Sequence, residues 1–316
     1  MNINTGRRRM SYIAGIGGAN MDVHGQSRGE LVMHDSNPGK LIMSMGGVCR
    51  NICENLARLG ENVYLVTVLG NDMNGRNILE GCEHAGIHMK GTRILDGEQS
   101  STYISITDRN GELVLAMSDM SIIKHLDDRL VDEAHVLLCG AELVVCDGNL
   151  STKSLDRLTR ICRNPLYMDP VSTAWAKEIS PYIGYFDTVK PNRMELEAMT
   201  GLSCDTLEHM QTACDILRGR GVKRVFVSLG KDGMFYRGPE GNIIGQSRPY
   251  PHTVNVNGAG DAAMAGIVYA TVHGWSPEQT VHAAMAAGMI AISSMNTINT
   301  EIHPVLIEKM IKEYIL

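Results

Sequence analysis

Short apolar segments alternate with helical stretches along most of this chain. Segments of strand length occur at Tyr12–Ile16, Val63–Val68, Val136–Cys139, Leu166–Asp169, Thr188–Lys190 and Arg224–Ser228. Continuous apolar runs of this kind, separated by helices, indicate a mostly parallel sheet covered by helices on both faces. The expected fold class is therefore α/β. The length of 316 residues allows one large domain of this class or two modest ones.

Two segments break this alternation. Residues from about 23 to 45 and from about 94 to 118 alternate polar and apolar side chains, and Asp108–Gly111 lies between two such runs as a hairpin turn would. We expect these segments to form a small antiparallel sheet outside the main layer. We expect residues 1–10 to be a mobile N-terminal arm and residues 11–316 to form one domain.

The stretch Asn255–Asp261 places small residues directly before a carboxylate, and an Ala- and Gly-rich helical run, Ala262–Ala270, follows it. Backbone N–H groups of Gly258, Ala259 and Gly260 at the start of a helix form an anion site. A carboxylate at this point is badly placed to bind an anion but well placed to accept a proton from a nucleophile. The stretch therefore suggests phosphoryl transfer with Asp261 as general base. The alternative is an ordinary glycine turn in which Asp261 is the helix N-cap.

A second glycine-rich element, Gly46-Gly47 followed by Asn51, opens another expected helix. Apolar residues recur at helical spacing from Asn51 to Leu59, and Gly60 stands where a helix-ending glycine belongs.

Together these elements resemble the ribokinase-like, or PfkB, family of carbohydrate and nucleoside kinases. The resemblance extends to Asn20–Asp22 after the first strand, to Lys190–Glu195 and to Ser228–Gly233. Five elements in family order are far more specific than any one of them. The resemblance implies a ribokinase-like sheet with a β lid, which is often a dimer surface.

The family resemblance also implies roles for individual residues. ATP and Mg²⁺ would be bound, with Mg²⁺ held through water by Asn192 and Glu195. The ribose hydroxyls would be bound by Asp22, Gly46, Gly47 and Asn51. The nucleotide would be bound by Lys190, Asn192, Ser228, Gly230, Gly233 and Gly288. Two of these assignments have simpler alternatives: Asn192 and Glu195 also fit a capping box, and small residues near Gly288 also fit close helix packing.

Within the family, the chain resembles the pseudouridine kinases. The resemblance lies in Ser36–Lys40, in the Arg50-Asn51 pair and in Ser101–Ile106 with the residues up to Met120. It implies transfer to the 5′-hydroxyl of a ribosyl compound, with Arg50, Thr102 and Asp119 as candidates for recognising the base. Another sugar or nucleoside kinase of the family is the alternative, and a non-catalytic nucleotide or sugar sensor is less consistent with the presence of Asp261.

Composition and missing motifs exclude or disfavour several other classes of function. A net charge of −6 argues against a nucleic-acid partner. No run of about 18 apolar residues predicts a membrane span, and the first apolar run is too short for a signal peptide, so we expect a cytoplasmic protein whose eight cysteines are reduced and buried. A P-loop motif is missing, which excludes a P-loop kinase. A Rossmann oxidoreductase is the competing enzyme class, but the dinucleotide motif that begins at Gly15 has Asn20 in place of its third glycine.

The turn before Asp261 also bears on cation dependence. Many members of the family have Asp six residues before the base and Thr four residues before it, and this chain has Asn255 and Asn257. An amide supplies no full negative charge to offset the desolvation of a cation. We therefore expect activation by a monovalent cation to be weak or absent.

Overall fold

The main body is a mostly parallel sheet between two layers of helices, as the alternation of strands and helices predicts. The computed structural model describes residues 11–316, so the predicted N-terminal arm lies outside the described residues. Within these residues the main sheet has the order β15-β14-β13-β12-β11-β10-β1-β4-β6, and only the pairings of β14 are antiparallel. Its strands are β1 (Ile13–Ile16), β4 (Val63–Val66), β6 (Ile87–His88), β10 (Leu143–Asp147), β11 (Leu166–Asp169), β12 (Thr188–Val189), β13 (Arg224–Ser228), β14 (Met234–Gly238) and β15 (Gly241–Gly245).

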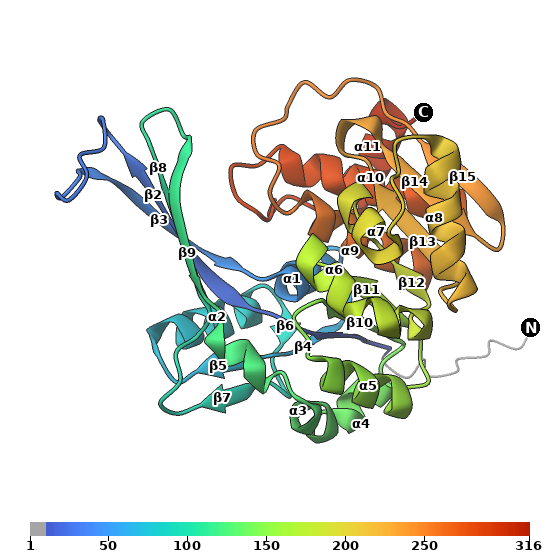
Figure 1. The fold of residues 1–316 in the computed structure, drawn as a ribbon, viewed down its shortest axis with the longest axis horizontal. Helices are drawn as coiled ribbons and strands as arrows, with labels where there is room; N and C mark the ends of the chain where they lie inside the picture. The colour runs from blue at the N-terminus through green and yellow to red at the C-terminus, as the bar shows by residue number, and fades with distance from the viewer. Residues whose placement is uncertain (1–10) are drawn as a thin grey trace, which may run out of the picture.

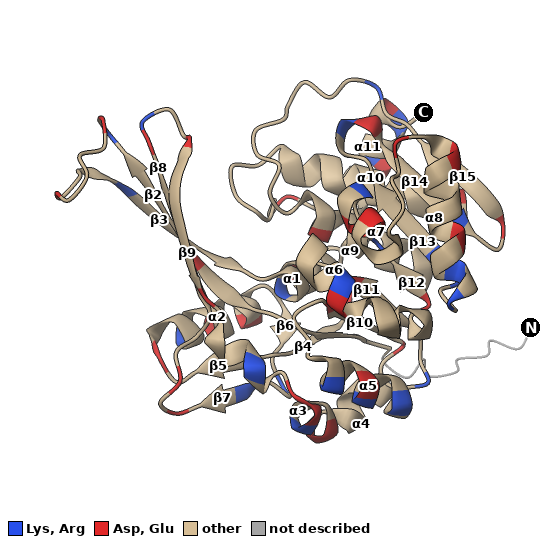
Figure 2. Cartoon of the chain, in the orientation of Figure 1, with Lys and Arg blue, Asp and Glu red and all other residues tan. Residues whose placement is uncertain are grey.

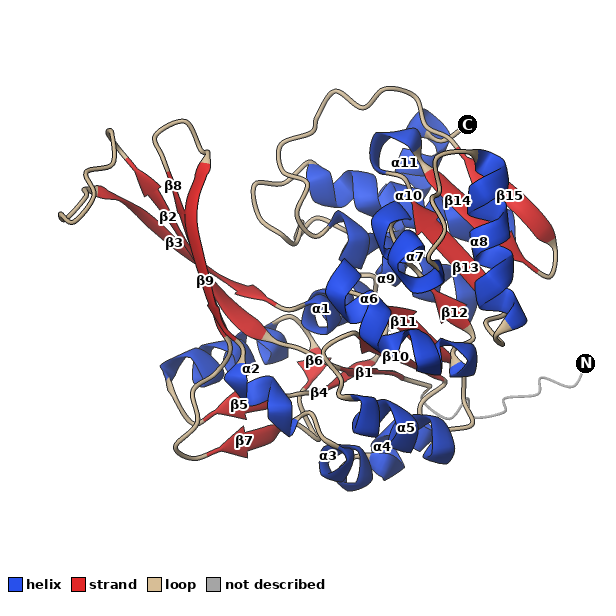
Figure 3. Cartoon of the chain, viewed as in Figure 1, coloured by secondary structure: helices blue, strands red, loops and turns tan. Residues whose placement is uncertain are grey.

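Helices cover both faces of this sheet and bury one apolar cluster on each side (Figure 3). One layer contains α1 (Val48–Arg58), α2 (Met73–His84), α9 (Ala259–Val272), α10 (Pro277–Ile292) and α11 (Pro304–Tyr314). The other contains α3 (Asp128–Glu133), α4 (His135–Gly140), α5 (Thr152–Ile161), α6 (Thr173–Ile179), α7 (Arg193–Thr200) and α8 (Leu207–Gly219). None of the helices in residues 11–316 is long and apolar enough to cross a membrane.

Close packing of α9 against α10 explains their many small residues. A Cβ at Gly266 would lie 2.7 Å from the Ala283 carbonyl oxygen, so the two backbones touch here. The helix α10 begins with a capping box in which the side chains of Ser276 and Gln279 each accept a hydrogen bond from the backbone N–H of the other.

A four-stranded lid projects from the main body (Figure 1). Its order is β3-β2-β8-β9, with β2 at Asn20–Ser27, β3 at Gly39–Gly46, β8 at Thr102–Thr107 and β9 at Leu113–Asp119. The predicted hairpin joins β8 to β9, but the central pair β2–β8 is parallel, so the lid is not wholly antiparallel. The reason is that β2–β3 and β8–β9 are separate hairpins laid side by side.

Two strand predictions are corrected by the structure. Val136–Cys139 is part of the helix α4, and the strand at this place is β10. Cys139 is consequently exposed, whereas the other seven cysteines are buried and all eight are free. The segment Val63–Val68 is divided at Thr67, because β5 (Val68–Gly70) leaves the main sheet and pairs with β7 (Arg93–Leu95).

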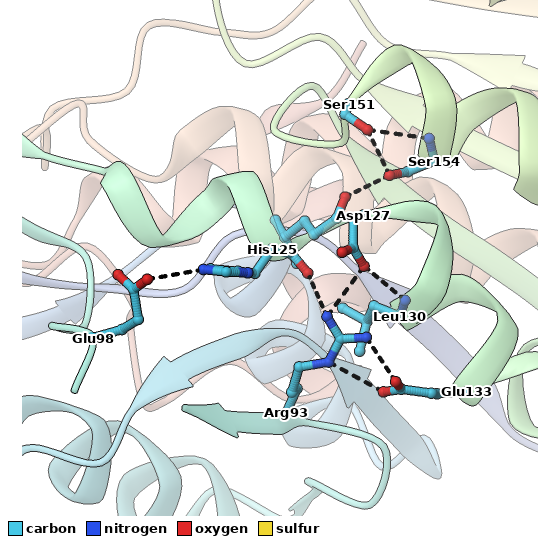
Figure 4. Close-up of polar contacts among 9 residues, drawn as sticks. Arg93, Glu98, His125, Asp127, Leu130, Glu133, Ser151 and Ser154 are labelled. Atoms are coloured by element: carbon cyan, nitrogen blue, oxygen red, sulfur yellow. Dashed lines mark hydrogen bonds and ion pairs between the residues drawn. The ribbon is translucent and has the colours of Figure 1, made fainter. Parts of the chain in front are cut away.

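Arg93 of β7 fastens this small sheet to α3. Its guanidinium donates to the His125 carbonyl at 3.2 Å, contacts Asp127 at 3.1 Å and pairs with Glu133 at 2.9 Å (Figure 4). These contacts anchor the β5–β7 sheet to α3 and to the turn that precedes it.

Candidate active site

The candidate site lies where strands of the main sheet end and the helices α1 and α9 begin. Gly258 precedes α9 with φ of 78°, and a Cβ there would lie 2.2 Å from the Thr297 carbonyl oxygen, so glycine is required. Gly258 is also the N-cap, and no side chain caps this helix. The alternative that Asp261 is the N-cap is therefore wrong. The Asp261 side chain is directed elsewhere, and the N-terminal N–H groups of α9 are left for an anion.

Asp261 contacts Asn51, which comes from the start of α1. Asn51 Nδ2 donates to Asp261 Oδ2 at 2.7 Å. Burial and the nearby charge of Asp169 raise the pKa of Asp261 from its ordinary 3.8 to about 7, against the opposing effects of Asn51, Lys190 and Arg50. A carboxylate whose pKa lies near neutrality is suited to accept a proton during catalysis.

A buried ion pair lies beside this carboxylate. Lys190 Nζ is 3.1 Å from Asp169 Oδ2, and a Cβ at Gly260 would lie 3.4 Å from the same ammonium. Burial opposes the charge on Lys190, but the carboxylates of Asp169, Glu195 and Asp261 raise its pKa. A charged ammonium therefore lies against the turn that the sequence predicts to be an anion site.

The paired glycines bring Asp22 and the lid close to α1. Asn20 Nδ2 donates to Asp22 Oδ1 at 2.6 Å, and burial raises the pKa of Asp22. A Cβ at Gly46 would lie 2.3 Å from Asp22 Oδ2. Gly47 has φ of 100°, and a Cβ there would lie 2.5 Å from the Gly18 carbonyl oxygen. Side chains at either position would push Asp22 or the β1–β2 loop away.

Asn192 and Glu195 form the capping box that the sequence allows. Asn192 Oδ1 accepts from the Glu195 N–H at 2.9 Å, and Glu195 Oε2 accepts from the Asn192 N–H at 2.8 Å. Burial raises the pKa of Glu195. Among residues 11–316 no three His, Cys, Asp or Glu side chains could hold a metal ion together. Glu195 Oε1 and the charge of the carboxylate fit an ion held through water, because Mg²⁺ takes oxygen ligands and keeps several waters.

The predicted nucleotide turn lies next to this element. An isolated bridge pairs Asn192 with Ser228 at the end of β13. Gly230 and Gly233 follow with φ of 61° and 95°, and a Cβ at Gly233 would lie 2.1 Å from the carbonyl oxygen of Gly245. The turn therefore depends on glycine.

Gly288 packs against the start of α9. A Cβ at this position of α10 would lie 3.4 Å from the Ala259 carbonyl oxygen. Helix packing thus accounts for Gly288, and its role toward a nucleotide stays a prediction.

The lid register places Thr102 and Asp119 away from Asp22. Paired residues on neighbouring strands share a face of a sheet, and successive residues on one strand face opposite sides. Tyr103 pairs with both Asp22 and Ser118, whereas Thr102 and Asp119 pair with each other in the adjacent row. Tyr103 and Ser118 therefore share the face of Asp22, which sequence reasoning did not identify.

Contacts agree with this placement. Asn74 of α2 donates to Thr102 Oγ1 at 3.1 Å, and Asp119 Oδ1 accepts from the Ser121 N–H at 3.0 Å. Arg50 is fully buried beneath Asn51 and bonds to protein acceptors. The structure does not bring Thr102 and Asp119 to the face of Asp22, and it places Arg50 under the site.

The structure places near the candidate site two carboxylates that were not identified from the sequence. Asp147 and Asp169 end the neighbouring strands β10 and β11 in register. Asp147 Oδ2 accepts from the N–H groups of Gly18 at 2.9 Å and Cys49 at 3.0 Å, which caps α1 and fixes the β1–β2 loop. The available signal was an Asp at the carboxyl end of a buried strand, because ligands of parallel sheets bind at that edge.

Comparisons with known proteins agree on the family of this chain. Residues 10–303 match the family model described as pfkB family carbohydrate kinase. The chain is 33% identical to the pseudouridine kinase of Escherichia coli (strain K12) over 93% of this chain and 95% of that protein. A putative sugar kinase from Clostridium perfringens is 32% identical with a TM-score of 0.89, covering 97% of each chain. A putative ribokinase II from E. coli, solved in complex with ATP and Mg²⁺, has a TM-score of 0.83 at 18% identity, covering 96% of this chain and 99% of that one. The fold is ribokinase-like.

Proposed function

Because the chain belongs to the pfkB family of carbohydrate kinases, we propose that it transfers the terminal phosphoryl group of ATP to the 5′-hydroxyl of a ribosyl compound. The acceptor we propose is pseudouridine, which the 33% identity to a pseudouridine kinase supports. One observation carries the proposal of catalysis: Asp261, with a pKa near 7, lies beside the uncapped N-terminus of α9 and the Lys190 ammonium.

The proposed reaction assigns a step to each of these groups. Asp22 and Asn51 bind ribose hydroxyls, and Asp261 accepts the proton of the 5′-hydroxyl. The hydroxyl oxygen then bonds to the terminal phosphorus while the bond from that phosphorus to the bridging oxygen of ADP breaks. Backbone N–H groups of Gly258, Ala259 and Gly260 bind the negative charge on the transferring group, and Lys190 adds a cation.

Further residues of the proposal serve the nucleotide. Ser228, Gly230 and Gly233 would line its site, with Gly288 nearby, and Asn192 and Glu195 would hold Mg²⁺ through water. When bound, Mg²⁺ neutralises phosphate charge. The proposal includes a cytoplasmic location, where ATP is available and free thiols persist.

A substrate panel tests the proposed function. Initial rates would be measured with ATP and Mg²⁺ for pseudouridine, uridine, ribose, adenosine and fructose 6-phosphate. Pseudouridine should have the highest kcat/KM, since buried polar groups that pair with only one base edge reject an analogue strongly. Equal kcat/KM for pseudouridine and uridine, or a preference for free ribose, would instead favour a general nucleoside or sugar kinase. If none of these compounds is phosphorylated, the hypothesis that remains is a non-catalytic nucleotide- or sugar-binding protein.

We also propose that two copies of the chain associate through the lid. Its strands are mostly uncharged (Figure 2) and carry large exposed apolar side chains. These are Leu41, Ile42, Met43, Ile104, Leu113, Val114, Leu115 and Met117. An apolar surface of this kind on one element is typical of an interface. Light scattering of the wild-type protein should give twice the mass of the chain. Leu115→Glu in the lid should halve the measured mass, whereas Val305→Glu on the exposed face of α11 should leave it unchanged. A monomeric wild-type protein would refute this part.

A further inference from the structure

Arg50 is a fully buried cation in the first turn of α1, directly before Asn51. Its Nε donates to the Gly46 carbonyl at 2.7 Å, and one terminal nitrogen donates to the Met45 carbonyl at 2.9 Å. The other terminal nitrogen pairs with Glu54 at 2.5 Å. The guanidinium is therefore held in one place by the end of the lid strand β3 and by the next turn of α1.

The same guanidinium also donates to Asn51 Oδ1. Because Arg50 can only donate and an ionised Asp261 can only accept, the amide of Asn51 has one favourable orientation between them. Its oxygen faces Arg50 and its NH₂ group faces Asp261, at 2.7 Å. Rotating the amide by half a turn would place two donors together on one side and two acceptors together on the other.

We propose that Arg50 is a positioning residue for the kinase reaction, which orients the Asn51 amide so that its NH₂ group is directed at Asp261, and that Glu54 holds Arg50 for this purpose. This inference rests on the proposed function. It replaces a direct role for Arg50 in contacting the base, because a side chain with 0% exposure under Asn51 reaches the ligand only through its neighbour.

The charges around Asp261 explain why the orientation of the Asn51 amide matters for the proposed base. Asp169 and Lys190 approach from the ends of β11 and β12, and Asn51 and Arg50 approach from α1. Asp169 repels the ionised base, while Lys190 is already paired with Asp169. The Asn51 NH₂ group is thus a direct donor to the base, and its loss should impair Asp261 during proton transfer.

Three variants separate positioning from simple stability. Arg50→Met combined with Glu54→Gln removes both buried charges together, so neither is left unpaired. Arg50→Lys keeps the charge but not the fork that reaches several acceptors at once. Arg58→Met is the matched control, because Arg58 pairs with the other oxygen of Glu54 at 2.7 Å and the Arg50–Asn51 bond does not involve it.

Kinetics provide the first measurement. For the double variant we expect kcat with the best substrate of the panel to fall about 10- to 100-fold, the range for loss of a hydrogen bond to a charged group. KM for ATP should stay within about twofold. The Arg50→Lys variant should recover less than about a tenth of the activity that the double variant loses. Arg58→Met should have the kcat of the wild-type protein. Wild-type kcat in a folded double variant would overturn the proposal.

The second measurement does not depend on activity. The side-chain amide signals of Asn51, assigned by their loss in Asn51→Asp, would be followed by NMR in protein without ligands. In the wild-type protein one NH₂ proton should be shifted and protected from exchange by Asp261, and in the double variant and in Arg50→Lys this protection should be lost. Unchanged signals would refute the positioning role. If no substrate of the panel is phosphorylated, the proposed function fails, and the NMR result still decides whether Arg50 orients Asn51.

Discussion

Asp261→Asn should make the protein more stable above neutral pH. The surroundings of Asp261 disfavour its ionised form, since burial and Asp169 raise its pKa from 3.8 to about 7. The folded protein therefore binds this proton more tightly than the unfolded chain. The stability that Asp261 contributes is fully present below about pH 4 and is lost as the pH rises to about 7. A neutral amide at this position removes that loss and can still accept from Asn51.

The magnitude follows from the shift in pKa. Moving the pKa from 3.8 to about 7 corresponds to about 4 kcal/mol above neutral pH, at roughly 1.4 kcal/mol for each tenfold change in proton affinity. Asp261 is partly accessible to water, which screens its charges. We therefore expect a gain of about 1–3 kcal/mol at pH 8 and a smaller gain at pH 5.

Urea unfolding without ATP or Mg²⁺ would measure this difference. The free energy of unfolding of the wild-type protein and of Asp261→Asn would be determined at several values between pH 5 and pH 8. Asp35→Asn, at an exposed position of the lid, is the control and should follow the wild-type profile. Parallel profiles for Asp261→Asn and the wild-type protein would show that the fold does not disfavour the ionised carboxylate, and the argument for a base tuned to neutral pH would fail.

Three further outcomes are expected. Asp261→Asn should lower kcat by roughly 10²–10⁴, and wild-type kcat/KM should rise with pH through about 7; near-normal kcat with unchanged KM would remove Asp261 as the base. Gly46→Ala should raise KM for the nucleoside about 10-fold or more by displacing Asp22, with no change in KM for ATP. Gly29→Ala is the control and should leave both KM values unchanged, because a Cβ at Gly29 would meet no atom within 4 Å. Equal effects of the two substitutions would contradict the steric argument. Added K⁺ should change the initial rate less than about twofold, compared with a tetramethylammonium salt at the same ionic strength. The reason is that the Asn255 side-chain oxygen carries no charge and already accepts a hydrogen bond from the Asn257 N–H at 3.0 Å. A severalfold rise in rate with K⁺ would show a working cation site.

Predictions that rest on local hydrogen bonding agree with the structure. The capping box of Asn192 with Glu195 is present, because it needs only residues three apart at a helix start. Val136–Cys139 shows the limit of local patterns. A short apolar run fits a strand or a helix equally, and the competing run Leu143–Asp147 forms the strand.

The fold class and the order of the site elements could be predicted from the residues, since apolar periodicity and glycine turns are local patterns of the chain. Which side chains meet depends instead on how the strands and helices pack. Asp169 and Lys190 become a pair because β11 and β12 are neighbours in the sheet, and Asn51 reaches Asp261 across 210 positions of sequence. The lid register likewise decided that Tyr103, and not Thr102, shares a face with Asp22. A shift of one residue in strand pairing reverses every face, and the chain carries no local signal of that pairing.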